Sequence, residues 1–346
     1  TGILYFPKIG NSVEVQKNKI QLYSNQVYVT DNVSDIVPEF LTLLHGVIDS
    51  PDIPLNVSRS YLQSDKNVKK ITGYITKKVA DKLNDLFKKD RASFEEKWND
   101  LNVFIKYGSI SNQDFDKKAA NFTLIKNIDN TYFTVGEYKE KIKENQTDKY
   151  DKVVMLYTHN VEEHDGFIQT AKNRGYDVLA FDSVIDNHFL QHLESREGDI
   201  TFVRVDSDTV DNLVQRDETN ESVLSEDEEN KIKELFEGIV AKSGTVVTKA
   251  MSPEDDPVVV VRPEFMRRMK EMQALQGFQG MDFPDSFNVV VNTNNSLIVN
   301  NLVSESDTDQ QKDMAKYLYN LALLNQNMLK GAELTSFIQK SMSFFK

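Results

Sequence analysis

Arg59 and Gln63 are the residues whose types and spacing point most directly to chemistry. They end the stretch "HGVIDSPDIPLNVSRSYLQ", in which Pro51 and Pro54 restrict the backbone ahead of a predicted helix. An arginine held by a stiff loop at a helix N-terminus is a fixed cation that can be lent to a phosphoryl-transfer site on another module. The same pattern also fits a surface arginine in a first helical turn, and the residues alone leave both interpretations open.

The usual catalytic and metal-binding patterns are poorly represented. Of the five histidines, His188 and His192 have the most ligand-like spacing, four residues apart on one helical face, but no glutamate follows the first as in HExxH. The sequence contains no GxSxG turn and no phosphate-cradling glycine loop. We therefore predict no metal site.

The composition limits the class of protein. A chain of 346 residues exceeds one core of the usual size, so we expect two or three domains. The net charge of -13 disfavours nucleic-acid binding, and no apolar run approaches a membrane span. Cysteine is absent, which excludes disulfides and thiolate sites. The opening "TGILYFPKIG" lacks an initiator Met and a basic region, so we expect a piece of a larger protein, cut on its N-terminal side, rather than a signal peptide.

The first part of the chain must supply the elements that position Arg59. Strands are predicted at residues 3–6 and around 20–29, where apolar and polar residues alternate. We predict a helix before the proline loop and a second one after it, with Ser58 as N-cap, followed by a helical segment with Phe94 and Trp98. The apolar stripe of the first helix is Ile36, Phe40, Leu43, Leu44 and Val47, and that of the second is Val68, Ile71, Ile75, Val79, Leu83 and Leu86.

From residue 150 the pattern alternates between strands and helices. The runs "DKVVMLYT", "YDVLAF" and "DITFVRV" predict three strands with helices between them, and Gly175 is a predicted helix stop. This order implies a small parallel α/β unit. The acidic residues 206–231 form the best linker or domain boundary, although the second half of this segment also fits a solvated helix face. Beyond it we predict a helix at 232–240, strands in "GTVVTKA" and "DPVVVVR", and helices from Asp309 to the end.

The run "GVIDSPDIPLNVSR" followed by "LQ" resembles the middle domain of the ninety-kilodalton heat-shock chaperone family, of the bacterial HtpG type. The similarity continues through "GILYFPK", "THNVEEHDGFI" and "FLQHLE" into the C-terminal third. Members of this family carry an N-terminal ATP-binding domain, a middle domain and a dimerisation domain. The resemblance implies that this chain holds most of the last two domains and that the ATP-binding domain is missing.

The resemblance also assigns roles to particular residues. Arg59 corresponds to the arginine of a catalytic loop that contacts the γ-phosphate of ATP, Gln63 supports the active arrangement, and Asn56 and Ser58 flank them in the loop. Client proteins would contact a Met-rich amphipathic helix, whose composition also fits a core helix rich in methionine. More weakly, they would contact two positions on a helix of the small α/β unit, where the family's Glu-Trp pair is not matched. The predicted client-binding residues are Phe265, Met266, Met269 and Met272 on the first helix and Asn187 and His188 on the second.

The terminal helices carry more apolar residues than one narrow stripe needs, which favours a helix pair that packs on its own copy. We therefore predict a homodimer formed through Leu318, Leu321, Leu324, Phe337 and Ile338. ATP and Mg²⁺ would act in the full-length parent only, and this chain alone is expected to be inactive. The ending "SFFK" lacks the acidic tail by which eukaryotic cytosolic members recruit tetratricopeptide co-chaperones, so a bacterial or organellar member fits better, and we expect a cytoplasmic, bacterial one without that partner. The negative net charge and the lack of a long apolar run predict no nucleic-acid and no membrane partner.

Three functional hypotheses follow, of which the last, a purely structural scaffold, would require Arg59 and the Met-rich helix to be incidental. The first is a molecular chaperone fragment that binds unfolded or partly folded clients and forms a homodimer. Its predicted fold is α/β and α+β, with a middle domain of two layered α/β units joined by helices at 1–225 and an α+β dimerisation domain ending in helices at 226–346. Within the middle domain, residues 1–90 hold the catalytic loop, 91–149 a helical connector, and 150–225 the small α/β unit and linker. The alternative is a free-standing α/β ligand-binding enzyme that uses residues 150–207, which the missing phosphate loop disfavours.

Overall fold

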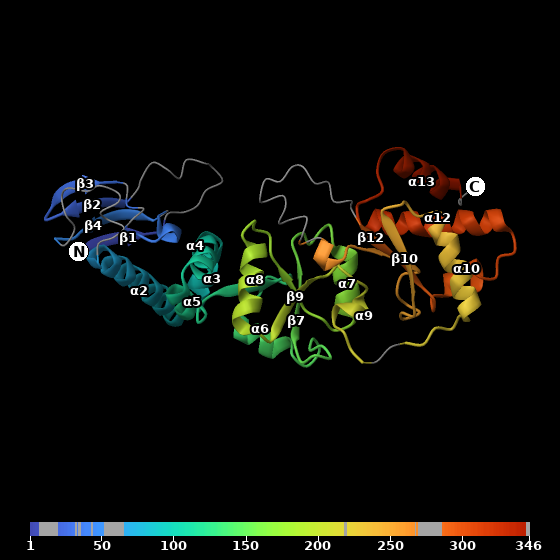
Figure 1. The fold of residues 1–346 in the computed structure, drawn as a ribbon, viewed down its shortest axis with the longest axis horizontal. Helices are drawn as coiled ribbons and strands as arrows, with labels where there is room; N and C mark the ends of the chain where they lie inside the picture. The colour runs from blue at the N-terminus through green and yellow to red at the C-terminus, as the bar shows by residue number, and fades with distance from the viewer. Residues whose placement is uncertain are drawn as a thin grey trace. The chain divides into compact units, whose positions relative to one another are not determined.

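The computed structural model describes residues 1–6, 20–31, 33, 36–42, 44–51, 66–217, 220–266, 268 and 286–343. Contacts divide the chain into two compact units, drawn in Figure 1. Unit 1 comprises Thr1–Tyr138 and Ser183–Glu197, and unit 2 comprises Lys139–Asp182 and Gly198–Lys346. The described residues form three mixed sheets and several helices, so the predicted mixture of α and β structure is confirmed at this level. The predicted domain boundaries stay predictions.

Unit 1 begins with a four-stranded sheet in the order β1-β4-β2-β3. Its strands are β1 (Gly2–Tyr5), β2 (Ile20–Ser24), β3 (Val27–Thr30) and β4 (His45–Asp49). β4 pairs antiparallel with β1 and parallel with β2, so it lies inside the sheet. Gly46 permits this pairing, because its φ is 140° and a Cβ there would lie 1.9 Å from the carbonyl oxygen of Ile3.

The helix predicted from the stripe between Ile36 and Val47 is wrong. The described part of this segment forms a single 3₁₀ turn, η1 (Glu39–Leu41), and then extends into β4. Ile36 and Phe40 are buried as the stripe required, whereas Val47 is exposed on a strand, and Leu43 lies outside the described residues. Because β4 pairs with strands on both sides, its non-local hydrogen bonds outweigh a local helical periodicity.

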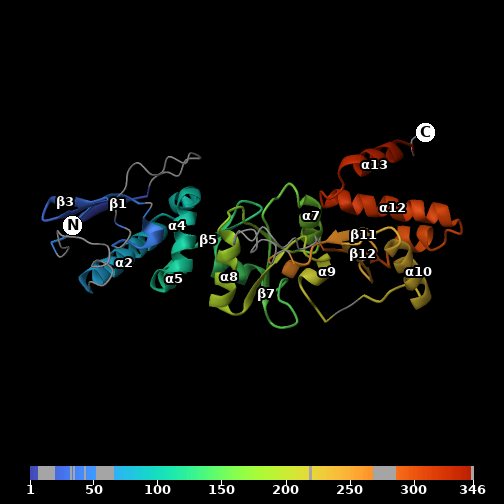
Figure 2. The same cartoon turned by 45° about the horizontal axis from the view of Figure 1, so that its top comes forward.

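Helices pack against this sheet. They are α2 (Lys66–Lys89), α3 (Arg91–Glu96), α4 (Trp98–Ser111) and α5 (Gln113–Ala119), and they are followed by a hairpin of β5 (Leu124–Asn127) and β6 (Tyr132–Thr134). Figures 1 and 2 show α2 running beside the sheet. The predicted helix at α2 is confirmed, because Ile75 and Leu83 join Ile20 and Leu22 of β2 in one core. The segment predicted as a helical connector also contains the β5–β6 hairpin.

A buried ion pair fixes α8 (Asp186–Glu197) to α4 within unit 1. Lys106 Nζ lies 2.5 Å from Asp186 Oδ1, and both side chains are almost completely buried. On α5, Asp116 Oδ1 accepts a hydrogen bond from Arg196 Nη1 of α8 at 2.9 Å. Since a buried charge is tolerated only when it is paired and hydrogen-bonded, these contacts set where α8 packs on α4 and α5.

The first part of unit 2 follows α6 (Val135–Ile142) and contains three parallel strands in the order β8-β7-β9. Its elements are β7 (Val153–Thr158), α7 (Asp165–Asn173), β8 (Val178–Ala180), β9 (Ile200–Arg204) and α9 (Val210–Leu213). All six residues of β7 are buried. Gly175, with a φ of 76°, follows the end of α7 as predicted. The predicted parallel strands are therefore confirmed.

The last part of unit 2 has a core of its own. α10 (Glu226–Glu237) begins with a capping box between Ser225 and Glu228. The elements after it are β10 (Gly244–Lys249), β11 (Val258–Val261), β12 (Phe287–Asn292), a π-helical segment η2 (Leu297–Leu302), α12 (Thr308–Asn325) and α13 (Gly331–Ser343). β12, the central strand of the sheet β10-β12-β11, was not among the predicted strands. α10 and α12 pack on this sheet (Figure 2). Among the described residues, no helix has the length and apolar character needed to cross a membrane.

Replacing Lys106 with methionine should destabilise unit 1 by ~3–5 kcal/mol, because the Asp186 carboxylate would stay buried without its counter-ion. Trp98 is the single tryptophan and is buried in unit 1, so urea unfolding followed by its fluorescence reports on this unit. The matched control is Lys117→Met, because the exposed pair of Lys117 with Asp114 should contribute at most about 0.5 kcal/mol.

Equal unfolding midpoints for the Lys106 and Lys117 variants would contradict this interpretation. If Lys106→Met does not fold, the double variant Lys106→Met/Asp186→Asn provides the test. Removal of the second buried charge should recover part of the lost stability.

Candidate functional site

The predicted catalytic loop lies outside the described residues. The residues concerned are Asn56, Ser58, Arg59 and Gln63. The structure describes how the chain enters and leaves this segment. At the end of β4, the backbone N–H of Asp49 donates a hydrogen bond to the carbonyl oxygen of Thr1, and that of Ser50 donates to the carbonyl oxygen of Tyr23. After the loop, α2 begins at Lys66. Both ends of the loop are therefore attached to ordered elements of unit 1, while the roles of the four residues stay predictions.

The Met-rich segment begins with a helical turn at residues 264–266. Phe265 is 70% exposed and Met266 is half-buried. Met269 and Met272 lie outside the described residues. The large apolar side chain of Phe265 thus faces solvent at the start of the segment predicted to bind clients. It is much more exposed than a phenylalanine in a core.

Polar contacts attach this helical turn to the small parallel sheet of unit 2. Arg268 Nε lies 2.7 Å from Glu264 Oε1, and Arg268 Nη2 donates a hydrogen bond to the carbonyl oxygen of Phe202 on β9 at 2.8 Å. Tyr157 of β7 donates its hydroxyl hydrogen to Glu264 at 3.4 Å. Because these bonds hold the base of the turn, Phe265 is presented to solvent from a fixed position.

The second predicted client segment lies on α8 in unit 1, whereas Phe265 belongs to unit 2. Asn187 is half-buried and His188 is exposed. The pair formed by Lys106 and Asp186 fixes the first turn of this helix. His188 is therefore displayed on a rigid helix, with no large apolar group at either position to bury against a client.

The residues predicted for dimerisation divide into a buried and an exposed group on α12 and α13. Leu318 and Phe337 are 6% and 7% exposed and belong to the core of unit 2, where Phe337 stacks on Tyr317 with 5.0 Å between the ring centroids. The exposed group is Leu321, Leu324 and Ile338, at 41%, 40% and 45%. The buried group holds the helix pair together, and the exposed group is what a second copy could cover.

Met342 extends the exposed apolar group and was not predicted. It is 63% exposed and lies four residues after Ile338 on α13, one helical turn further along. This i,i+4 spacing from Ile338 is the sequence signal that could have identified it.

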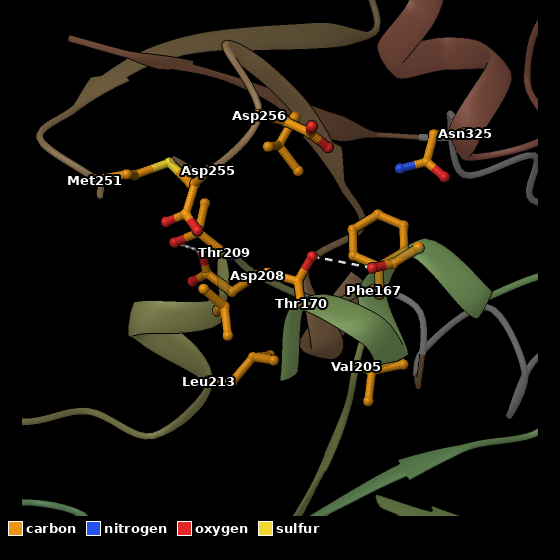
Figure 3. A pocket seen from close by; sticks show the side chains of 13 residues that line it. Phe167, Thr170, Val205, Asp208, Thr209, Leu213, Met251, Asp255, Asp256 and Asn325 are labelled. Atoms are coloured by element: carbon orange, nitrogen blue, oxygen red, sulfur yellow. Dashed lines mark hydrogen bonds between the residues drawn. The ribbon is translucent and has the colours of Figure 1, made fainter. Parts of the chain in front are cut away.

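A small cavity lies between α7, α9 and the C-terminal segments of unit 2. Its volume is about 30 Å³, and its lining combines Phe167 and Leu213 with the carboxylates of Asp208 and Asp255 (Figure 3). Burial raises the pKa of Asp255, while the ion pair with Arg174 at 2.8 Å opposes that shift. Such a volume accommodates a water molecule but not a nucleotide or a peptide side chain, so this cavity is a gap in the packing rather than a ligand site.

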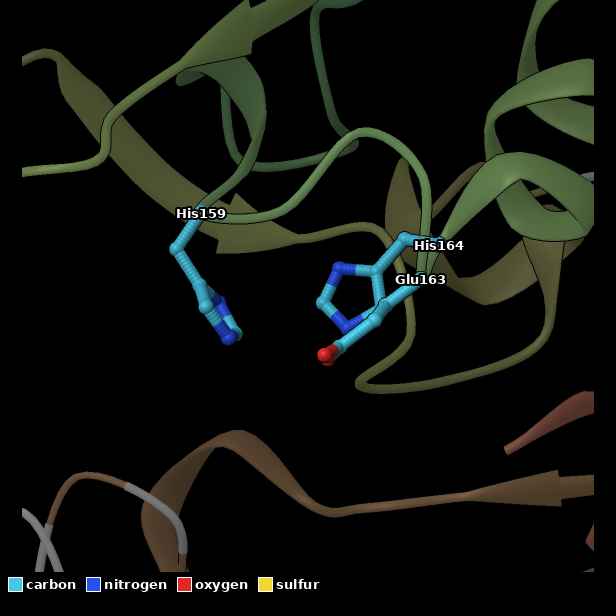
Figure 4. Close-up of side chains that lie close together, drawn as sticks. All are labelled: His159, Glu163 and His164. Carbon is cyan, nitrogen blue, oxygen red and sulfur yellow. The ribbon is translucent and has the colours of Figure 1, made fainter. Parts of the chain in front are cut away.

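One group of metal-ligating side chains comes together among the described residues. It consists of His159, Glu163 and His164, which lie between β7 and α7 with ligand atoms within 4.8 Å of one another (Figure 4). His192, one of the two histidines with ligand-like spacing, instead faces Asp116 at 3.1 Å. His159, Glu163 and His164 were not predicted from the sequence, because a five-residue separation of two histidines matches no common metal motif.

Comparisons with known proteins cover nearly the whole chain. The family model described as Hsp90 protein matches residues 1–344. The chaperone protein HtpG of Bacteroides thetaiotaomicron is 50% identical over 306 residues, which cover 86% of this chain and 45% of that protein. The HtpG of Bacteroides fragilis is 42% identical over 413 residues, with 99% and 60% covered, and that of Porphyromonas gingivalis is 48% identical over 316 residues, with 89% and 46% covered. The chain therefore spans about three fifths or less of the length of these relatives.

Replacing Phe265 with serine should change the free energy of unfolding by no more than about 0.5 kcal/mol, because its side chain is already exposed. The matched change Phe337→Ser removes an aromatic ring from the core and should cost ~3–5 kcal/mol. Denaturant unfolding followed by circular dichroism compares the two variants. A large loss of stability for Phe265→Ser would mean that this residue is part of a core.

Proposed function

Because this chain belongs to the Hsp90 protein family, in its bacterial HtpG type, we propose that it is the client-binding and dimerising part of an ATP-dependent molecular chaperone. The observation that carries this proposal is the family match over residues 1–344. The chain spans 60% of the Bacteroides fragilis relative, and in this proposal the rest of the parent protein binds ATP and Mg²⁺. The parent protein acts in the bacterial cytoplasm.

Arg59 supplies positive charge to the ATPase site of the parent. Negative charge spreads over the γ-phosphoryl oxygens in the transition state, and an arginine delivered from another module stabilises it. Gln63 supports the active arrangement of the loop, and Asn56 and Ser58 flank it. The attachment of the loop to β4 at one end and to α2 at the other supports this role, because a cation must be held in place to act on one phosphate.

The homodimer forms through the outer faces of α12 and α13. Leu321, Leu324 and Ile338 are exposed on helices whose other faces are buried in the core of unit 2. A second apolar face on a helix is stable in water when another surface covers it, and a second copy provides an identical face. Leu318 and Phe337 contribute by holding the two helices together.

Unfolded or partly folded clients bind the Met-rich segment. Phe265 offers exposed apolar area, and Met266, Met269 and Met272 add flexible side chains that adapt to different partners. Asn187 and His188 make at most a weak contribution. If this is correct, Phe265→Ser should suppress client aggregation less well than the unaltered protein at equal stability.

The alternative of a free-standing enzyme built on residues 150–207 is less well supported. The family match extends across those residues together with the rest of the chain. A single family over this whole length favours one chaperone function over a separate enzyme in the small α/β unit.

The triple variant Leu321→Ser/Leu324→Ser/Ile338→Ser should weaken dimerisation at least about tenfold, because each change removes apolar area that the dimer would bury. Sedimentation velocity at several concentrations measures this. Truncation near Ser304 should also give a monomer, but it removes Leu318 and Phe337 from the core as well. The point variant therefore separates dimerisation from folding.

The control is Val184→Ser, since Val184 is an exposed valine in unit 1. It should sediment as the unaltered protein does. A triple variant that remains fully dimeric would place the interface elsewhere.

In the full-length parent, Arg59→Ala should lower ATP turnover by about 10³-fold or more and leave ATP binding nearly unchanged, because the lost charge acts mainly in the transition state. Arg59→Lys should not restore turnover fully, since lysine lacks the planar pair of donors. Lys69→Ala, in the exposed early part of α2, is the control. Turnover and nucleotide affinity are measured separately, and the present chain alone should show neither. Normal turnover of the Arg59→Ala parent would remove this residue from the mechanism.

A further inference from the structure

The turn between β7 and α7 places three metal-ligating side chains at the carboxyl end of a parallel strand. We propose that His159, Glu163 and His164 bind one divalent transition-metal cation, with Zn²⁺ as the reference case. Figure 4 shows the three side chains pointing toward a common region from one turn. β7 lies between β8 and β9, and the carboxyl ends of such parallel strands are where α/β units bind ligands.

Hydrogen bonds hold this turn in one conformation. Asn160 Oδ1 accepts backbone hydrogen bonds from Glu162 at 3.1 Å and Glu163 at 3.2 Å. The carbonyl oxygen of Asn160 accepts from the backbone N–H of His164 at 3.2 Å. The positions of Glu163 and His164 relative to β7 are therefore set before a cation arrives, which reduces the entropy lost on binding.

A second contact orients the His164 ring. Thr158 Oγ1 donates to the carbonyl oxygen of Asn160 at 3.0 Å, so it accepts the hydrogen bond that links it to His164 Nδ1 at 2.8 Å. The hydrogen then sits on Nδ1, and Nε2 carries the lone pair that a metal needs. In metal sites, a ligating histidine is commonly oriented by a hydrogen bond from its other ring nitrogen, as Thr158 orients His164 here.

The charges around the turn favour a cation. His164 Nε2 lies 3.6 Å from Asp206 Oδ2, which is longer than a hydrogen bond. The lone pair of this ring nitrogen therefore faces a negatively charged oxygen, and a cation between the two would be attracted to both. Arg204 carries an opposing charge, with Nη1 3.5 Å from His159 Nδ1, but its guanidinium donates two hydrogen bonds to the Asp206 carboxylate. Arg204 and Asp206 thus balance each other, and the carboxylate of Glu163 leaves a negative charge at the turn.

The ligand set selects the class of metal. Two imidazoles and one carboxylate suit Zn²⁺, Co²⁺ or Ni²⁺, whereas Mg²⁺ and Ca²⁺ prefer oxygen ligands alone. Three protein ligands would leave further coordination positions to water. This proposal differs from the sequence-based expectation of no metal site, which stays a prediction, and it is independent of the chaperone function.

The test is a titration of the tag-free chain with Co²⁺, followed by its visible absorption, and with Zn²⁺ by calorimetry. A His188→Ala background removes the helical pair formed with His192, which could bind a cation by itself. One equivalent should bind, and Zn²⁺ should displace Co²⁺. Glu163→Gln and His159→Ala should each weaken binding at least about tenfold, because loss of an outer contact alone costs that much in metal sites.

Glu162→Gln is the matched control, since Glu162 is an exposed acid in the same turn but lies outside the cluster. It should bind as the background does. His159 and Glu163 are exposed, so their variants should retain the fold, which circular dichroism checks. Equal affinities for Glu163→Gln and Glu162→Gln, absence of saturable binding, or loss of binding through His188→Ala alone would each overturn the proposal.

Discussion

Burial of the interior strands β7 and β12 is the constraint on which the proposed functional features of unit 2 depend. All six residues of β7 are buried, and so are five of the six in β12. A strand covered on both faces leaves only its ends for polar groups. Thr158 and His159 stand at the carboxyl end of β7, where the turn with the proposed metal ligands begins. Asn292 ends β12 and donates its side-chain amide to the carbonyl oxygen of Ser252 at 2.8 Å.

The same core determines which apolar surface remains for a partner. α12 buries one face, which includes Leu318 and Leu323, against the sheet around β12. Leu321 and Leu324 then remain on the other face of the helix, because a helix cannot bury its whole circumference against one sheet. Phe265 is also left uncovered. Glu264 and Arg268 attach its helical turn to the small parallel sheet through polar contacts, and these do not require the Phe265 side chain to be buried. The proposed dimerisation and client binding would therefore use apolar surface that the core of unit 2 leaves uncovered.

Sequence patterns correctly predicted the elements whose contacts are close in the chain, and those whose apolar residues keep one period over many turns. α2 keeps its period over many turns, and Gly175 marks the end of α7. The prediction failed for residues 36–47, where the stripe was helical but Gly46 and the pairing of β4 with two strands imposed an extended conformation. β12 was missed because its central position depends on β10 and β11, which precede it by several tens of residues.

The sequence by itself determined the family through "GVIDSPDIPLNVSR", the parallel strands after residue 150, and the apolar excess of the terminal helices. Only the tertiary structure decided that Leu318 is buried while Leu321 is exposed, that His159 and His164 meet with Glu163, and that α8 packs on α4. Residue periodicity reflects geometry over one or two helical turns or a few strand residues. Lys106 and Asp186 are 80 positions apart, and their contact depends on the packing of the whole unit, which no local pattern specifies.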